Sequence, residues 1–427
     1  MAKQQHCTRY LTIYIGFSLI AFTFGLTSNA KAQNYAWRKA IDTLCSPAMH
    51  GRGYTNNGAG KAADYLKSEL IQMGLFPIKG KFGMQISELI NTFDSTVILK
   101  AGKVNLEVGV HFLPDPACGK FEGSFKLFNP DPSQLENPRY QTKWKNRLQS
   151  GKYWLVVDTL GKETKTKVLQ TFGANAAGIV TVAKKLTHSF AQEQGKPELI
   201  VLPTALQYLS KKWYLKAAPE LKAQVIQNVF ASTKPITDTS KVILITAHYD
   251  HLGEIGKTYF PGANDNASGT AMTLAVAKHF TSKSLIKLPT YPVVFVFFGG
   301  EEAGLLGSKA FTLSDIVPLG NIKTLINLDL MAGGSEGIMM VNGDTEKELY
   351  NKLVRINNTT KTVPAIKSRP NAPNSDHYWF AKKGVPAVFL YTMGGPTAYH
   401  DIYDSPDRLT FTWFEKVYSL LVGFVVE

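Results

Sequence analysis

The fold is decided by residues 241–280, which read KVILITAHYDHLGEIGKTYFPGANDNASGTAMTLAVAKHF. The stretch opens with an unbroken apolar run at 242–245, the pattern of a strand covered on both faces in a parallel sheet. It then passes through a loop dense in His and Asp, and residues 267–280 close it with helical periodicity. Because open α/β sheets place their ligands at the carboxyl ends of their strands, this loop is predicted to carry function.

Three further apolar runs repeat the pattern. Residues 293–298, 324–328 and 387–390 are predicted to be buried strands, and polar residues follow each of them. Apolar residues at helical spacing predict helices over 59–73 and 411–426, which would pack on the sheet. The predicted fold class is therefore α/β, with a mixed, mostly parallel central sheet flanked by helices.

The middle of the chain has a different character. Residues 108–226 contain apolar strands, such as 153–157 and 178–182, that are interrupted by polar and Pro-containing connections. We expect an inserted, mainly-β domain here, between the two parts of a catalytic domain at 33–107 and 227–427. The insertion either shapes access to a site elsewhere or is a structural addition.

The first 32 residues read as a targeting segment. Lys3 and Arg9 give a basic start, residues 11–26 form an apolar run broken by polar residues, and residues 30–32 resemble a small-x-small cleavage site. We predict a signal peptide over 1–32 and an exported protein, periplasmic or secreted, with an uncleaved membrane anchor as the alternative. No later segment holds about 18 apolar residues in a row, so no stable membrane insertion is expected once the signal is removed.

Composition limits the partners. The 427 residues are 44% hydrophobic and 19% charged, which is typical of a globular protein, and the formal net charge is +14. Loss of Lys3, Arg9 and Lys31 with the signal peptide lowers this charge to +11. Lysines are scattered and no nucleic-acid-binding module is recognised, so we expect no nucleic acid partner but an electrostatic association with an anionic cell envelope.

Two cysteines follow the predicted signal peptide, Cys45 and Cys118. In an oxidising compartment they could pair, or they could remain as two free buried thiols. The sequence leaves both alternatives open.

The ends of the four predicted strands carry residues that bind metals. Parallel strands would bring these ends to one edge of the sheet, where two imidazoles and three carboxylates would suit a pair of zinc-like divalent ions. Two such ions, about 3.5 to 4 Å apart, can acidify a shared water and polarise a carbonyl, so hydrolysis is predicted. The candidates after the four strands, in order, are His248 with Asp265, then Glu301 with Glu302, then Asp329, then Tyr399 with His400.

Within this group the acidic doublet suggests two roles. Neighbouring residues of an extended loop point in different directions, so one glutamate of Glu301 and Glu302 could bind a metal while the other acts as general base. Asp250 could hold the far nitrogen of His248 or a loop amide. Tyr399 could donate its hydroxyl to a developing oxyanion, although a tyrosine at such a position is more often a packing residue.

Several motifs resemble those of a known family. The runs AHYDHLG, GANDNASG, FGGEEAGLLGS, NLD and YHDIYD, spread over residues 227–409, are similar to the co-catalytic zinc metallopeptidases of the bacterial leucyl aminopeptidase type, a family that includes glutamate carboxypeptidase-like enzymes. The early run LCSPAMHGRG also resembles the N-terminal portion of that family. The insertion, with FGANAAGIVTV, resembles the protease-associated domain of many members.

The resemblance implies a dizinc exopeptidase with peptide substrates. His248, Asp265 and Asp329 would hold one Zn²⁺, and Asp265, Glu302 and His400 the other, so that Asp265 bridges the two. Glu301 would be the general base for attack by a metal-bound hydroxide, with Asp250 as a supporting residue. A cis peptide is expected between Asp265 and Asn266. Ser375, Asp376 and His377, in the run SDHYWF, are candidate substrate-pocket residues.

Aminopeptidase activity is the leading functional hypothesis. A carboxypeptidase or dipeptidase on the same scaffold is the nearest alternative, and it would need an Arg or Lys aimed at the substrate carboxylate, which the sequence does not place. A glutaminyl cyclase with one zinc and a receptor-like binding module without metals are further alternatives. All five ligand positions are intact, which favours a hydrolase over both the glutaminyl cyclase and the receptor-like module.

Overall fold

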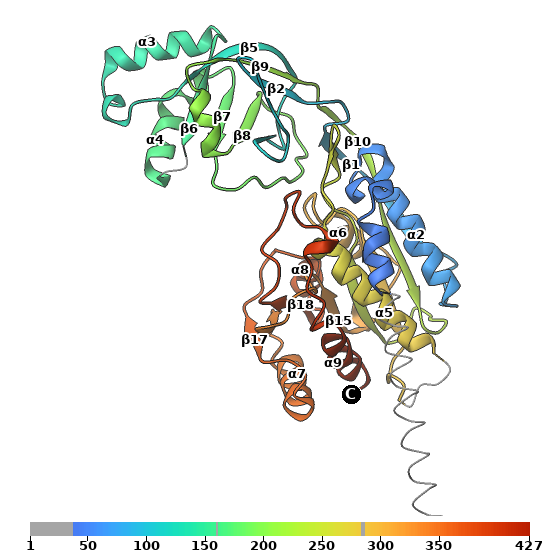
Figure 1. Cartoon of the computed structure of the whole chain (residues 1–427). Coiled ribbons are helices and arrows are strands. Elements are labelled where there is room, and N and C mark those ends of the chain that lie inside the picture. Colours follow the sequence, from blue (N-terminus) through green and yellow to red (C-terminus); the bar gives the residue numbers. More distant parts are fainter. Residues whose placement is uncertain (1–36, 159–160, 283–286) are drawn as a thin grey trace, which may run out of the picture.

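The computed structural model describes residues 37–158, 161–282 and 287–427 (Figure 1). The predicted signal peptide lies outside the described residues. Among the residues that are described, no helix is both long and apolar enough to cross a membrane.

The main sheet contains all four strands predicted around the candidate site. Its four central strands lie side by side and run parallel, in the spatial order β14, β11, β15 and β18. This confirms the predicted mixed, mostly parallel sheet. From one edge to the other, the eight strands are β1 (Gly83–Thr92), β10 (Glu220–Ser232), β14 (Val293–Phe298), β11 (Val242–His248), β15 (Ile322–Leu328), β18 (Ala387–Met393), β16 (Gly337–Val341) and β17 (Ile366–Arg369).

Helices cover both faces of this sheet. In β14, Phe295 and Phe297 pack into the core on one face, whereas Val294, Val296 and Phe298 pack into the core on the other. Burial on both faces explains why the strand reads as an unbroken apolar run. The first face is covered by α2 (Gly58–Gln72), α5 (Gly269–Thr281), α7 (Lys347–Thr360) and α9 (Phe414–Val426), and the second by α6 (Leu306–Phe311) and α8 (His377–Lys382).

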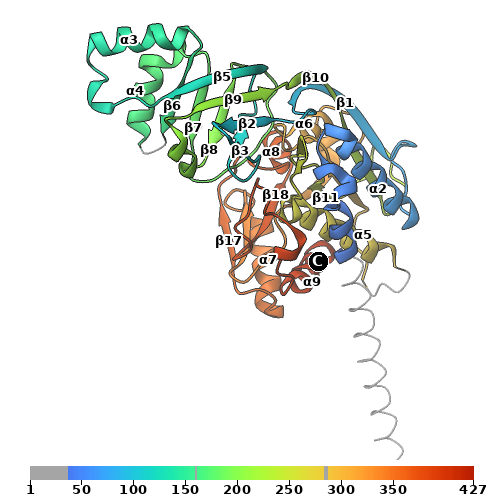
Figure 2. The ribbon, with the colours of Figure 1, turned by 45° about the horizontal axis from the view of Figure 1, so that its top comes forward.

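A second sheet forms a separate unit, seen at the upper left of Figures 1 and 2. Two helices, α3 (Pro138–Gln149) and α4 (Lys162–Phe172), pack against one of its faces through an apolar cluster of their own. This confirms the predicted mainly-β unit beside the α/β sheet. Its strands are, in spatial order, β3 (Val104–Leu106), β2 (Ile98–Ala101), β9 (Lys212–Ala217), β5 (Phe121–Phe128), β6 (Tyr153–Asp158), β7 (Ile179–Val182), β8 (Glu198–Val201) and β4 (Phe112–Pro114).

The two sheets are joined by a ribbon of two paired strands. β1 and β10 are antiparallel neighbours from the pair Gly83 and Val229 to the pair Thr92 and Glu220. The chain leaves the main sheet along β1 and returns along β10, so the second sheet takes strands from Ile98 onward rather than from residue 108. The sequence does not reveal this boundary, because a continuous strand crosses it without a linker.

The two cysteines of the described chain do not pair. Cys45 and Cys118 are both buried and free, and they belong to the separate cores of the two units. Burial raises the pKa of each thiol to about 12. Of the two alternatives left open by the sequence, the structure has the free thiols.

Candidate metal centre

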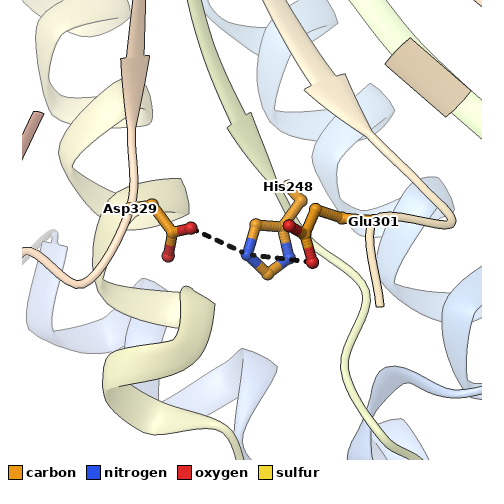
Figure 3. A group of neighbouring side chains, drawn as sticks. All are labelled: His248, Glu301 and Asp329. Carbon is orange, nitrogen blue, oxygen red and sulfur yellow. Dashed lines mark ion pairs between the residues drawn. The ribbon is translucent and has the colours of Figure 1, made fainter. Parts of the chain in front are cut away.

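The carboxyl ends of the four parallel strands meet at one point. His248 is the last residue of β11, Asp329 follows β15 directly, and Glu301 lies three residues beyond β14. Figure 3 shows these three side chains facing one another. The loop after β18 brings His400 to the same place, 3.0 Å from Glu302 between Nε2 and Oε2. The structure therefore brings together residues that are up to 152 positions apart in the sequence.

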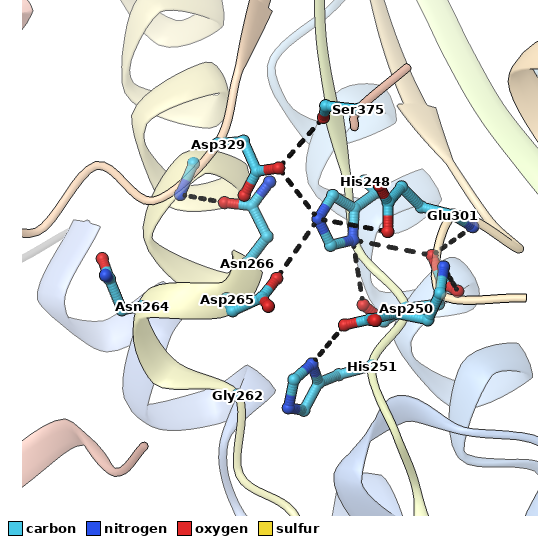
Figure 4. Close-up of polar contacts among 12 residues, drawn as sticks. His248, Asp250, His251, Gly262, Asn264, Asp265, Asn266, Glu301, Asp329 and Ser375 are labelled. Atoms are coloured by element: carbon cyan, nitrogen blue, oxygen red, sulfur yellow. Dashed lines mark hydrogen bonds and ion pairs between the residues drawn. The ribbon is translucent and has the colours of Figure 1, made fainter. Parts of the chain in front are cut away.

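Asp265 lies between the two imidazoles. Its Oδ1 is 3.4 Å from Nε2 of His248, and its Oδ2 is 3.1 Å from Nε2 of His400. The same Nε2 of His248 is also 3.4 Å from Oδ2 of Asp329 and 4.0 Å from Oε2 of Glu301 (Figure 4). One carboxylate thus faces two separate groups of ligand atoms.

The backbone fixes the tautomer of both histidines. Nδ1 of His248 is 3.2 Å from the main-chain oxygen of Asp250, and Nδ1 of His400 is 3.1 Å from the main-chain oxygen of His188. A carbonyl can only accept, so each Nδ1 must carry the proton. In the neutral imidazole that a metal binds, each Nε2 would keep a lone pair directed at the carboxylates, which is the arrangement of a metal-binding histidine.

The two glutamates of the acidic doublet have different surroundings. Glu302 receives a hydrogen bond at Oε1 from Nδ1 of His251, at 2.7 Å, and turns Oε2 toward His400. Glu301 makes a longer contact with His248, at 4.0 Å, and lines the cavity described below. The carboxylate of Asp250 accepts hydrogen bonds from the amides of Glu301 and Glu302, at 3.2 and 3.4 Å. The carboxylate of Asp250 therefore holds loop amides, which is one of the two roles predicted for it.

The charges of this cluster are not balanced by the protein. Burial would lower the pKa of His400, but Glu302 and Asp265 raise it to about 11. Burial raises the pKa of Glu301 well above its usual range; His248 lowers it, and Glu302 raises it further. Both shifts reflect crowded, buried negative charge, which costs free energy without a cation.

The donor set fits a pair of zinc-like ions. The described residues provide two groups that share His248, and within each group the ligand atoms lie within 4.8 Å of one another. The first group is His248 with Glu301 and Asp329, and the second is His248 with Asp265 and Glu302. Imidazole nitrogens and carboxylate oxygens are ligands of Zn²⁺. In addition, Oδ1 of Asp329 is buried without a hydrogen-bond partner, which leaves it available for an ion.

A polar chain beneath the centre supports Asp329. Ser375 donates its hydroxyl to Oδ2 of Asp329 at 3.0 Å and accepts a hydrogen bond from Asn327 at 2.7 Å. Asn327 in turn accepts from the hydroxyl of Thr246 at 2.7 Å. All four residues are buried. Ser375 is thus a support of the cluster.

The other two residues of that motif also lie away from the cavity surface. Asp376 and His377 are fully buried, and Nε2 of His377 is 3.0 Å from the side-chain oxygen of Asn371. Ser375, Asp376 and His377 are all absent from the lining of the cavity described below, so this cavity does not support their expected place in the substrate pocket. Ser375 contacts the buried carboxylate of Asp329, whereas His377 contacts Asn371.

Two further supporting residues were not recognised from the sequence. Arg52 is fully buried and donates to the main-chain oxygens of Tyr249, Pro261 and Gly262, each at 2.7 Å. It therefore joins the loop after β11 to the segment before Asp265. An arginine within an early glycine-rich run was the available signal, but its partners lie 197 to 210 residues away.

Asp404 holds the backbone at the bridging residue. Its two carboxylate oxygens accept from the amides of Asn264 and Asp265, at 2.8 and 2.9 Å. The peptide between Asp265 and Asn266 is cis, as expected from the resemblance. The run YHDIYD contains two aspartates, which was the available signal for a structural role of Asp404. The sequence does not indicate that its partners are the amides of Asn264 and Asp265.

A cavity of about 170 Å³ opens beside the cluster. Its walls include His248, Asp265, Glu301 and Asp329, together with the aromatic rings of Phe389 and Tyr391. Tyr399 lines it as well, with its ring stacked 3.9 Å from that of His400 and 45% of its surface exposed. Ligand pockets for larger molecules measure roughly 300 to 1,000 Å³, so this cavity suits a single amino-acid residue.

The inserted unit reaches this site. The amide of His188 donates to the main-chain oxygen of His400 at 2.9 Å, and the main-chain oxygen of His188 accepts from the His400 ring. Nearby, Nζ of Lys185 lies 2.9 Å from both Oδ2 of Asp401 and the main-chain oxygen of Tyr399. The loop that carries His400 is therefore held by residues of the second unit.

An α/β sheet that gathers buried imidazoles and carboxylates at the carboxyl edge of its strands is an arrangement typical of metal-dependent enzymes. Residues 228–425 match the family model described as Peptidase family M28. The predicted kinship with zinc metallopeptidases is confirmed.

Individual relatives agree with this assignment. The chain is 30% identical over 196 residues to a probable leucine aminopeptidase of Arthroderma otae, covering 44% of this chain and 54% of that protein. It is 26% identical over 302 residues to the aminopeptidase YwaD of Bacillus subtilis, covering 67% and 60%. The chain thus spans little more than half the length of these relatives.

The similarity of structure extends further than the similarity of sequence. A solved zinc aminopeptidase from Bacillus subtilis superposes with a TM-score of 0.68 at 18% identity, covering 92% of this chain and 94% of that one. At this identity the likeness shows the fold, which is thus shared over nearly the whole chain, including the inserted unit.

Proposed function

We propose that the protein is an exported aminopeptidase that holds two zinc ions and removes residues from the amino terminus of peptides. The observation that carries this proposal is the position of Asp265, which turns one oxygen toward His248 and the other toward His400. A carboxylate shared in this way fits two neighbouring ions better than one. The match to a peptidase family and the aminopeptidase names of its relatives support the choice of reaction.

In the proposed centre each ion has three protein ligands. His248, Asp265 and Asp329 would hold the first, and Asp265, Glu302 and His400 the second. When bound, the two ions would polarise the scissile carbonyl and make an adjacent water more acidic. His251 and Ser375 orient Glu302 and Asp329 through the hydrogen bonds described above.

Glu301 remains free in this assignment and would act as general base. It lines the cavity, while Asp250 holds its backbone through the amide. From there its carboxylate would take a proton from the attacking water and deliver it to the leaving amine. Tyr399, at the wall of the cavity, would donate its hydroxyl to the oxygen that gains negative charge.

The proposal is tested with three substrates. Zinc-loaded protein should hydrolyse an aminoacyl anilide with a free amino group and leave the N-acetylated anilide intact, and it should release the first residue of a tripeptide. Turnover of blocked substrates alone would contradict aminopeptidase activity. One zinc per chain together with cyclisation of N-terminal Gln would instead indicate a glutaminyl cyclase.

A matched pair of variants tests the mechanism. Glu301→Gln should lower kcat by at least about 100-fold while two zinc ions remain bound, because proton transfer is lost but the ligands are kept. Glu348→Gln, an exposed position on α7, is the control and should behave as the parent protein. Full activity of Glu301→Gln would refute the assigned base.

Export rests on residues 1–32 and their small-x-small site. Expression of the full chain in a bacterial host with two membranes should yield a mature protein that begins near residue 33 in the periplasm or the medium. N-terminal sequencing of that protein is the direct measurement. An intact chain that stays with the membrane fraction would favour the uncleaved anchor.

A further inference from the structure

Arg369 places a positive charge at the wall of the cavity beside the metal cluster. It is the last residue of β17 and lines the same cavity as Glu301 and Asp329. Its guanidinium carbon lies 5.3 Å from the centre of the Tyr391 ring, which also belongs to the wall. A cation over an aromatic face is held in place without losing its charge.

This guanidinium is only partly used by the protein. With the amide of Asn374 in its hydrogen-bonded orientation, Nη2 donates to the Asn374 oxygen at 2.7 Å. Nε is buried and has no hydrogen-bond partner, and no Asp or Glu of the described chain forms an ion pair with Arg369. The guanidinium therefore has hydrogen-bonding capacity that the described residues leave unused, and such unused capacity on a charged group is costly.

The charge balance of the loaded site leads to the same conclusion. The four carboxylates of the cluster, those of Asp265, Glu301, Glu302 and Asp329, would be offset by the four charges of two divalent ions. The carboxylates of Asp250 and Asp376 are also buried nearby but do not line the cavity, so among the described residues the cavity wall holds no further carboxylate as a counterpart for Arg369. A substrate that brings its own negative charge would supply one.

We infer that Arg369 binds a carboxylate of the substrate and that the enzyme acts on short peptides with an anionic group close to the scissile bond. This inference rests on the proposed function. The guanidinium is a planar fork that matches a carboxylate with two parallel hydrogen bonds. Because the cavity holds about one residue, the carboxylate must belong to a residue next to the cleaved bond.

Two sources could supply this carboxylate. It could be the side chain of an N-terminal Asp or Glu, or the free α-carboxylate of a dipeptide. The first is tested by comparing Glu-anilide with Gln-anilide, which have nearly the same size and differ in charge. The second is tested by comparing Leu-Leu with its C-terminal amide. In each pair, the charged member should be preferred if that source is correct.

The decisive comparison uses Arg369→Gln. We expect this variant to lower kcat/KM about 10- to 100-fold for the charged member of the preferred pair and less than about threefold for the neutral member. Arg369→Lys should retain part of the preference. Arg408→Gln is the matched control, because Arg408 also lies over a tyrosine ring, at 5.0 Å, but outside the cavity.

A binding measurement separates this inference from the proposed function. Thermal stabilisation of the zinc-loaded protein by glutamate, glutamine, Leu-Leu and Leu-Leu-amide does not depend on hydrolysis. Stabilisation by the charged member of a pair that is lost in Arg369→Gln supports the inference even if no peptide is cleaved. If Arg369→Gln lowers kcat/KM equally for charged and neutral substrates, the inference is overturned. It is also overturned if the parent protein shows no charge preference in either pair. Both outcomes leave the peptidase proposal standing.

Discussion

The imidazole of His400 donates a hydrogen bond to the main-chain oxygen of His188, and the amide of His188 donates back to the main-chain oxygen of His400. His188 belongs to the second unit, whereas His400 belongs to the catalytic loop of the main sheet. The orientation of a proposed metal ligand is therefore set from the inserted unit. This relationship gives the insertion a chemical role in addition to any role in access.

Lys185 provides a test of this coupling. In Lys185→Met the loop of His400 loses both the ion pair with Asp401 and the bond to the oxygen of Tyr399. We expect about 3- to 10-fold weaker binding of one of the two zinc ions and little change in melting temperature. Zinc per chain after dialysis against a weak chelator is the measurement. Lys184→Met, at an exposed neighbouring residue, should retain both ions.

Asp265 and Asp329 should differ in how many ions depend on them. Asp265→Asn removes charge from both groups of ligands, so we expect loss of both ions and at least a 1,000-fold loss of activity. Asp329→Asn should release one ion and keep the other. Metal analysis of the two purified variants gives the answer, and equal zinc content in both would contradict the bridging assignment.

Arg52 should be needed for stability rather than for chemistry. Arg52→Met leaves the main-chain oxygens of Tyr249, Pro261 and Gly262 without their buried donor. We expect the free energy of unfolding to fall by about 3 to 5 kcal/mol. Urea unfolding of the zinc-loaded protein measures it. Arg38→Met, at an exposed arginine that forms an ion pair with Asp42, should cost less than about 1 kcal/mol.

Burial of His377 should make the free energy of unfolding depend on pH. Burial lowers its pKa from 6.5 to about 3, so the folded protein binds fewer protons there than the unfolded chain. Its contribution to stability is complete above pH 6.5 and is lost as the pH falls toward 3, by at most about 1.4 kcal/mol per pH unit. The difference in unfolding free energy between parent and His377→Gln should therefore shrink as pH falls from 7 to 5. A constant difference across this range would show that His377 does not titrate with unfolding.

The central architecture could be predicted from sequence because its signals are local. Each buried strand appears as an apolar run, and each run is followed by residues of types that can bind metals, as at His248 and Asp329. Parallel pairing then implies one common edge. The structure has these strands at the predicted places, and it brings the polar ends together.

The supports of the site could not be predicted because their partners are distant in the chain. Nothing near Arg52 indicates the carbonyls of Pro261 and Gly262, and nothing near His188 indicates the ring of His400. The same holds for Arg369, whose place in the cavity depends on how β17 packs beside β16 and β18. Ser375 was assigned to the pocket for a related reason, since a polar motif does not reveal whether it faces a ligand or a buried carboxylate.

The paired strands β1 and β10 bring the two ends of the insertion together, so that the insertion could be replaced by a short turn. Thr92 and Glu220 are direct partners in the ladder, so the chain positions where the second unit departs and returns are neighbours. A tight turn grafted there would close a hairpin and leave every strand of the main sheet in register. The shortened protein would keep the core around the main sheet but have no residue at position 188, and the ring of His400 would be free to rotate. Loss of the insertion would thus release the orientation of one proposed metal ligand.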